Sequence, residues 1–293
     1  MVLGEVLSQS DIEQFIELGY VKLKEAYRPE DALAVQRAIW ERIEQRGILE
    51  ADPATWTEAR VHLRESYSGP VFERCNSPRL LTAMQDLVGK GRLLLRTPSL
   101  WGWWPVNFSL GADTPWTVPH QGWHWDGHHF RHFVDSPDQG LLALCIFSSI
   151  HAQGGGTLLA EGSHAVVARL LARHPDGVNL VDAIAELNRS EQWFHELTTA
   201  PASPVAEAAR IQRFMATTVR DDSGRSLRVV ELKGEPGDVY FCHPFLYHAA
   251  SQNHSGIPRF LCNRIGTLND RMRIYQNGPS LSPVEVSIRR ALA

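Results

Sequence analysis

The stretch GDVYFCHPFLYHAASQNHSGIPRFLCNRI, residues 237–265, consists of short apolar runs separated by glycine, proline and polar residues. Apolar, β-branched and aromatic runs of four to eight residues between turn residues are typical of β-strands. Gly237-Asp238 forms a turn into a first strand, a second run carries His248, and Arg259 opens a third strand. The stretch therefore predicts consecutive strands joined by short turns.

The same pattern begins at about residue 92. It recurs in RLLLRTPSLWGWW (92–104), LLALCIFSSI (141–150), GGTLLAEGSH (155–164) and LRVVELKG (227–234). Several short strands with turn signals between them predict an all-β sandwich or barrel.

The first part of the chain, residues 1–91, has helical patterns instead. A capping-box sequence at Ser10 and a stop at Gly19 predict one helix, and Pro29 begins a second. Leucines and other apolar residues at helical spacing predict a third helix from about Pro78.

Helical spacing returns inside the β region, at residues 164–219, with a helix start at Ser203-Pro204. We interpret it as an insert in a β core of residues 92–267. The tail, residues 268–293, ends in a short helix. Since no linker rich in proline or serine separates these parts, we expect residues 1–293 to form a single domain.

The composition excludes several classes of protein. A hydrophobic fraction of 43% and a charged fraction of 21% are usual for a globular chain. The net charge of −4, with both signs interspersed, gives no basic field for nucleic acid or anionic lipid. We expect no signal peptide, because no basic segment precedes an apolar one, and no apolar run approaches the length of a membrane span.

The four cysteines are far apart and form no C-x-x-C motif. Three lie in apolar, strand-like surroundings, so we expect reduced core thiols and a cytoplasmic protein. They are Cys75, Cys145, Cys242 and Cys262.

The stretch HQGWHWDGHHFRH, residues 120–132, holds five histidines around one aspartate. A lone H-x-D pattern is weak, and a polar surface turn is its plain interpretation. However, His248 on a later strand could complete a set with His124 and Asp126. Two imidazoles and one carboxylate on one face of a metal are typical of non-heme Fe(II) oxygenases, because the other face stays open.

With Arg259 eleven residues after His248, the chain resembles the Fe(II)/2-oxoglutarate-dependent dioxygenases, and among them the phytanoyl-CoA dioxygenase (PhyH)-like family. The resemblance spans about residues 95–267. Its motifs, in family order, are Gly122-Trp123-His124-Trp125-Asp126, Gly155-Gly156-Thr157 running to Gly162-Ser163-His164, Gly237-Asp238 through His243 to His248, and Asn253-His254-Ser255 before Pro258-Arg259. Two positions depart from the family pattern: Glu161 stands where proline is frequent, and Ser251 comes one residue late.

The resemblance implies a mainly β fold with flanking helices, whose core is a double-stranded β-helix (a jelly-roll, cupin-like fold). It implies that His124, Asp126 and His248 bind Fe(II) at the mouth of this core. Arg259 would bind the distal carboxylate of 2-oxoglutarate, for which a permanently charged, planar guanidinium is better suited than lysine.

Three further residues are candidate contacts of the co-substrate, although each also has a purely structural interpretation. Thr157 follows a glycine pair, as does a co-substrate-binding threonine of related dioxygenases. Strand alternation puts Asn263 on the same face as Arg259. Gln121, just before the first ligand, is a candidate for the proximal carboxylate.

The remaining histidines are not needed as ligands. We expect His128, His129 and His132 near the site or facing substrate, and we interpret His243 as a packing residue.

The tryptophans of residues 101–125 are expected mainly in the core, with one or two against a flat or apolar part of the substrate. His129 and Arg131 beside them could meet an anionic part. The insert and the first helices are expected to cover the mouth of the core.

The function implied by the resemblance is hydroxylation of an unactivated C–H bond in a small molecule. It would use Fe(II), 2-oxoglutarate and O2, with ascorbate as reductant in vitro, and release succinate and CO2. Desaturation, epimerisation or cyclisation by the same chemistry stays open, whereas Asp126 argues against a halogenase, which has a small residue there.

Two other classes of function compete with an oxygenase. One is a non-catalytic jelly roll that binds a metal or small ligand, although a pure binder has no need of Arg259. The other is a zinc hydrolase with the same three ligands. The expected partner is a small-molecule substrate, with no nucleic acid and no membrane, and the sequence leaves the oligomeric state open.

Overall fold

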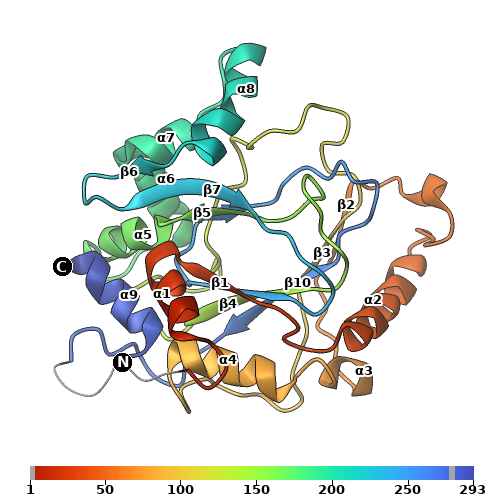
Figure 1. Ribbon diagram of the computed structural model, residues 1–293, viewed down its shortest axis with the longest axis horizontal. Helices are drawn as coiled ribbons and strands as arrows, with labels where there is room; N and C mark the ends of the chain where they lie inside the picture. Colours follow the sequence, from red (N-terminus) through yellow and green to blue (C-terminus); the bar gives the residue numbers. More distant parts are fainter. Residues whose placement is uncertain (1–3, 277–280) are drawn as a thin grey trace.

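The structure is a computed structural model that describes residues 4–276 and 281–293, and two antiparallel sheets form its centre (Figure 1). The first sheet has the order β1 (Tyr20–Leu23), β8 (Val239–Cys242), β4 (Leu141–Ile146), β10 (Leu261–Gly266). The second has the order β6 (Val219–Arg220), β7 (Ser226–Glu231), β5 (Leu158–Glu161), β9 (His248–Ala249). A separate pair joins β2 (Arg60–Leu63) to β3 (Trp104–Asn107). The predicted mainly β core with flanking helices is confirmed.

Strand β4 shows why the central strands are apolar throughout. All its residues are buried, because alternate side chains point to opposite faces of a sheet and both faces are covered. Leu142, Leu144 and Ile146 face the space between the sheets, together with Leu261 of β10. The alternate residues of β4 belong to a second, larger core cluster that also holds helix residues.

Helices surround the two sheets. Before the core they are α1 (Gln9–Leu18), α2 (Pro29–Glu44), a short 3-10 turn (Pro53–Thr55), α3 (Pro70–Glu73) and α4 (Pro78–Val88). Between β5 and β6 lie α5 (Ser163–Ala172), α6 (Leu180–Ser190), α7 (Gln192–Thr198), α8 (Pro204–Ile211) and a π-helical turn (Gln212–Ala216), and α9 (Pro283–Leu292) ends the chain. In Figure 1, α2 and α3 lie on one side of the sheets and α6 to α8 on the opposite side, whereas α9 packs against α1, α4 and α5.

Three sequence predictions need correction. Residues 1–91 are not purely helical: β1 and β2 are four-residue strands, too short to interrupt the helical patterns around them. The capping box of α1 is made by Ser8 and Asp11 rather than begun by Ser10, although Gly19 ends the helix with φ +87°. In the stretch 92–104 only Trp104 belongs to a strand, and Leu93 and Trp101 form isolated bridges.

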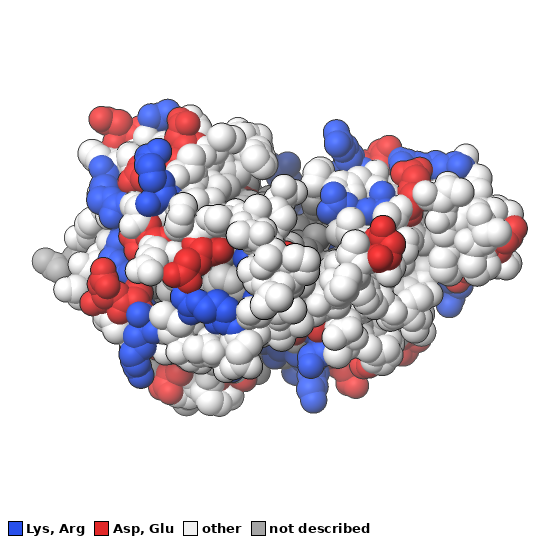
Figure 2. Space-filling view, turned by 90° about the horizontal axis from the view of Figure 1, so that it is seen from above, with Lys and Arg blue, Asp and Glu red and all other residues white. Residues whose placement is uncertain are grey.

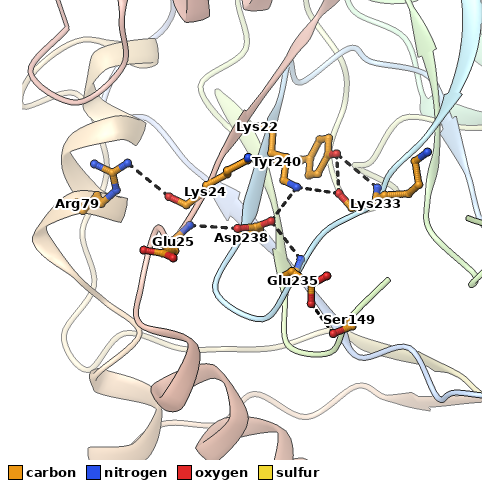
Figure 3. A network of polar contacts seen from close by, with 9 residues as sticks. All are labelled: Lys22, Lys24, Glu25, Arg79, Ser149, Lys233, Glu235, Asp238 and Tyr240. Atoms are coloured by element: carbon orange, nitrogen blue, oxygen red, sulfur yellow. Dashed lines mark hydrogen bonds and ion pairs between the residues drawn. The ribbon is translucent and has the colours of Figure 1, made fainter. Parts of the chain in front are cut away.

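The Gly237-Asp238 turn has a structural role, which Figure 3 shows. Asp238 accepts hydrogen bonds from the backbone N–H groups of Glu25 (3.1 Å) and Glu235 (3.1 Å), and forms an ion pair with Lys22 (2.8 Å). These contacts hold the end of β1 against the start of β8, which carries the chain toward His248.

The surface has no uniform charge. On the face drawn in Figure 2, acidic and basic side chains are interspersed, and the surface is hollowed near its middle. Within residues 4–276 and 281–293, no helix combines the length and apolar character that a membrane span requires.

Candidate metal centre

The two candidate histidine ligands lie opposite each other in an isolated antiparallel bridge. The N–H of His124 donates to the carbonyl of His248 (2.9 Å), and the N–H of His248 donates to the carbonyl of His124 (2.7 Å). Since residues paired in this way point their side chains to the same face, the two rings approach to 4.5 Å between centroids. Asp126 follows two residues after His124 and therefore joins the same face.

Backbone carbonyls fix the orientation of both rings. Nδ1 of His124 contacts the carbonyl of Gly122 (2.8 Å), and Nδ1 of His248 contacts the carbonyl of Leu246 (3.0 Å). When Nδ1 donates its proton to a carbonyl, Nε2 carries a free lone pair that can bind a metal. Oδ1 of Asp126 lies 3.6 Å from Nε2 of His124 and 4.0 Å from Nε2 of His248.

This donor set fits a divalent transition metal. The ligand atoms of His124, Asp126 and His248 all lie within 4.8 Å of one another, and the described part of the chain holds no other such group of three. Oδ2 of Asp126 is buried and has no hydrogen-bond partner among the described residues. A buried carboxylate oxygen without a partner is costly unless a cation is bound, and two imidazoles with one carboxylate suit Fe(II).

The surroundings also set the protonation of these groups. Burial, and then the neighbouring His124, lowers the pKa of His248 to about 4, so its ring is neutral near pH 7. Burial raises the pKa of Asp126, but the contacts with His124 and His248 outweigh it and leave that pKa below its usual value. One neutral imidazole and one ionised carboxylate are forms that bind a metal.

Arg259 lies in the same cavity and is 2% exposed. Its Nε donates to the carbonyl of Gly155 (2.9 Å), which orients the guanidinium, while Nη1 is buried without a partner among the described residues. Burial, and then the charge of Arg60, lowers the pKa of Arg259 to about 10, so it stays charged at neutral pH. A buried cation with an unused donor is suited to a bound carboxylate.

The glycine pair before Thr157 lets the chain pass close to its neighbours. A Cβ on Gly156 would lie 1.9 Å from the carbonyl oxygen of Leu232, and Gly155 has φ +77°. This tight segment presents the Gly155 carbonyl to Arg259 and puts Thr157 in the cavity wall.

The cavity brings nearly all the predicted site residues together. Its volume is about 640 Å³, within the usual range for small-molecule sites. His124, His248, Arg259, Thr157, Gln121 and Asn263 line it, and Asp126 lies behind them against the two histidines.

The other histidines divide as follows. His128 lines the cavity, whereas His132 is buried and its Nε2 contacts the carbonyl of Gly127 (3.0 Å) in the turn after Asp126. His243 packs against the ring of His164 at 4.9 Å, away from the cavity, in agreement with the packing role predicted for it.

Two expectations about the substrate end of the site concern residues that do not line the cavity. Arg131 does not line the cavity, because its guanidinium donates to the carbonyls of Asp176 and Gly177 (2.7 Å each), and His129 does not line it either. The insert, which we expected to cover the mouth of the core, supplies no residue to the cavity wall, and its place over the mouth stays a prediction. Arg210 of α8 holds the segment before the first ligand, through the carbonyls of Val118 and Pro119.

Three residues that line the cavity were not individually predicted from the sequence. Arg60 and His62 lie on β2, in a region expected to be helical, and Trp103 is the exposed member of the tryptophan group. The alternation in RVHL, residues 60–63, could have indicated the strand, although not its place beside the cavity.

Comparisons with known proteins agree with this arrangement. The family described as Phytanoyl-CoA dioxygenase (PhyH) matches residues 15–261. No curated protein is significantly similar in sequence to the chain.

The fold is similar to solved structures. EctD from S. alaskensis, crystallised with 2-oxoglutarate and 5-hydroxyectoine, has 15% identity and a TM-score of 0.50 over 88% of this chain and 74% of EctD. The carbocyclase SnoK, described as non-heme and alpha ketoglutarate dependent and from nogalamycin biosynthesis, has 15% identity and a TM-score of 0.47 over 92% of this chain and 88% of SnoK. The likeness to EctD supports the predicted jelly-roll core.

Proposed function

This chain belongs to the phytanoyl-CoA dioxygenase (PhyH) family of Fe(II)/2-oxoglutarate-dependent oxygenases, and we propose that it hydroxylates an unactivated C–H bond of a small molecule, releasing succinate and CO2. One observation carries the proposal. Three metal-ligating groups and a buried, permanently charged arginine with an unused donor meet at one cavity.

In this proposal His124, Asp126 and His248 hold Fe(II), each through the atom that faces the other two. Bound there, Fe(II) supplies the activation of O2 that is coupled to oxidative decarboxylation of 2-oxoglutarate. The backbone contacts at Nδ1 of both histidines keep Nε2 available and prevent the rings from turning away.

Arg259 binds the distal carboxylate of 2-oxoglutarate. Because the Gly155 carbonyl holds Nε, the remaining N–H groups of the guanidinium are oriented before the co-substrate arrives. Thr157 can add a hydroxyl donor, and its side chain has no hydrogen bond to the described residues. Gln121 and Asn263 offer amide groups to the proximal carboxylate or to the substrate.

The apolar part of the cavity keeps water from the reacting groups. Leu144 and Leu261, both about 1% exposed, lie in its wall. An apolar wall beside a polar cluster is what a site needs when an unactivated C–H bond must be held close to the metal.

Succinate formation tests the proposal. The purified protein is supplied with Fe(II), 2-oxoglutarate, ascorbate and O2, and succinate is measured with and without a library of small molecules. We expect Fe(II)- and O2-dependent succinate, increased by substrates whose products gain one oxygen atom.

Other outcomes would select other functions. Products that lose two hydrogens, or keep their mass with altered stereochemistry, would replace hydroxylation by desaturation or epimerisation. Activity with Zn(II) in the absence of O2 would indicate a hydrolase, and tight metal binding without succinate would indicate a binding protein.

A further inference from the structure

One wall of the cavity carries a second arginine. Arg60 on β2 is paired with Asn107 on β3, and Asn107 forms a bridge with Arg259. Paired residues of adjacent strands share a face, so Arg60 and Arg259 project to the same side, two strands apart. Both line the cavity, and His62 follows Arg60 on the same face of β2.

Neither the guanidinium of Arg60 nor Nε2 of His62 has a hydrogen-bond or ion-pair partner among the described residues. Across residues 4–276 and 281–293, the guanidinium of Arg60 makes no ion pair or side-chain hydrogen bond. Nε2 of His62 is buried and has no partner among the same residues. By contrast, the buried guanidinium of Arg210 is used fully, since it donates to several backbone carbonyls.

The cavity wall is also positive. None of the described residues that line it is an aspartate or glutamate, although the whole chain has a net charge of −4. Burial, and then the charges of Arg60, Arg64 and Arg259, lower the pKa of His62. The imidazole is therefore neutral near pH 7 and surrounded by cations.

A count of charges, which rests on the proposed function, shows that Arg60 is not needed at the metal site. The two positive charges of Fe(II) and the one of Arg259 balance the single charge of Asp126 and the two of 2-oxoglutarate. Arg60, which is exposed to solvent, is not needed for this balance. Its charge is therefore available to an anionic group on the primary substrate.

Trp103 indicates what the rest of such a substrate resembles. Its side chain is 45% exposed, it lines the cavity, and its ring meets that of His62 edge to face at 5.4 Å between centroids. Pro105 and Leu110 extend this apolar wall. An exposed indole beside a free guanidinium suits a ligand with a flat or apolar body and an anionic end.

We propose that Arg60 and His62 bind a carboxylate group of the primary substrate, and that the flat or apolar part of this substrate lies against Trp103. Arg60 supplies the charge, and Nε2 of His62 supplies a neutral donor. The carboxylate is thereby held apart from the co-substrate carboxylate at Arg259.

Matched pairs of acids and amides test the proposal, because each pair differs only in charge. The probes are 3-phenylpropanoate, indole-3-acetate and octanoate, each with its primary amide. Dissociation constants are measured by calorimetry on the anaerobic protein loaded with Fe(II) and 2-oxoglutarate, and stimulation of 2-oxoglutarate consumption is measured in air.

We expect at least one acid to bind about 10-fold more tightly than its amide, the gain from one charge-assisted hydrogen bond. Arg60→Gln should reduce this ratio to about 1, and Arg60→Lys should keep part of it. His62→Phe, which retains a ring against Trp103, should weaken acid binding. The control Arg37→Gln removes an equal charge from the exposed side of α2 and should keep the wild-type ratio.

Two results would overturn the proposal. In one, no acid binds better than its amide, or the preference survives in Arg60→Gln. In the other, Arg60→Gln weakens 2-oxoglutarate binding while the acid-to-amide ratio stays unchanged, which would assign Arg60 to the co-substrate. Absence of any Fe(II)-dependent 2-oxoglutarate consumption would instead refute the proposed function itself.

Discussion

Arg259→Lys keeps a positive charge in the cavity but removes the planar fork of donors. In the structure, Nε of Arg259 is engaged with Gly155, and the other guanidinium nitrogens are available for the distal carboxylate. Lysine has a single ammonium group at the end of a shorter side chain. Its single nitrogen cannot stay at the Gly155 carbonyl and also bind both carboxylate oxygens in the parallel arrangement of a guanidinium.

The size of the effect follows from that loss. A hydrogen bond to a charged group contributes about 1.5–3 kcal/mol, so the variant should bind 2-oxoglutarate about 10- to 150-fold more weakly. Arg259→Gln also removes the charge, and its loss should be larger, on the order of 30-fold to several thousand-fold. Iron content should change little, because Arg259 does not contact the ligand atoms.

The assay is succinate formation against varied 2-oxoglutarate, with metal analysis of the same preparation. Arg264→Lys is the matched control: Arg264 lies on β10, which begins just after the bridge residue Arg259, but its guanidinium donates to Asn76 and Ser99 outside the cavity. This control should keep the wild-type KM for 2-oxoglutarate. An unchanged KM in Arg259→Lys would remove Arg259 from the co-substrate site.

Three further predictions concern histidines and the metal. Asp126→Ala and His248→Ala should each weaken Fe(II) binding, as measured by metal titration. Loss of a group that only hydrogen-bonds a metal ligand costs roughly 10- to 100-fold in affinity, and loss of a ligand itself should cost more. Near wild-type affinity in either variant would reject the ligand set. His243→Ala should still bind iron, and complete loss of iron would mean that the wrong distal histidine was chosen. Burial lowers the pKa of His164 to about 4. As the pH falls from 6.5 toward 4, His164 therefore takes up a proton in the unfolded chain but not in the folded protein. The free energy of unfolding should fall by about 3 kcal/mol over this range. Urea unfolding across this range should show a smaller loss in His164→Gln than in the wild type or the exposed control His195→Gln, and equal losses would contradict the assignment.

The β core could be predicted from the sequence because its strands are buried on both faces. A strand such as β4 leaves a continuous apolar run, and glycine or polar residues mark its ends. The four-residue strands β1 and β2 carry no such signal, since they alternate and lie between strong helical patterns. Their pairing with β8 and β3 depends on contacts far apart in the chain.

The same distinction applies to the candidate site. His124, Asp126 and His248 stand in an order and spacing that the sequence displays, and the structure brings their ligand atoms together. Arg60 and His62 were missed because their place in the cavity depends on β2 pairing with β3, which local patterns do not reveal. Arg131 was assigned to the substrate because it is near the first ligands in sequence, but its donors are used by backbone carbonyls.

The most direct test of the central claim is an anaerobic titration of the metal-free protein with Fe(II) in the presence of 2-oxoglutarate, followed by visible absorption. If the three ligands and Arg259 form one site, a charge-transfer band between Fe(II) and chelated 2-oxoglutarate should appear and saturate at one equivalent of iron. In His248→Ala the band should be lost or strongly weakened. A wild-type protein that shows no band, or a band unchanged in His248→Ala, would contradict the account.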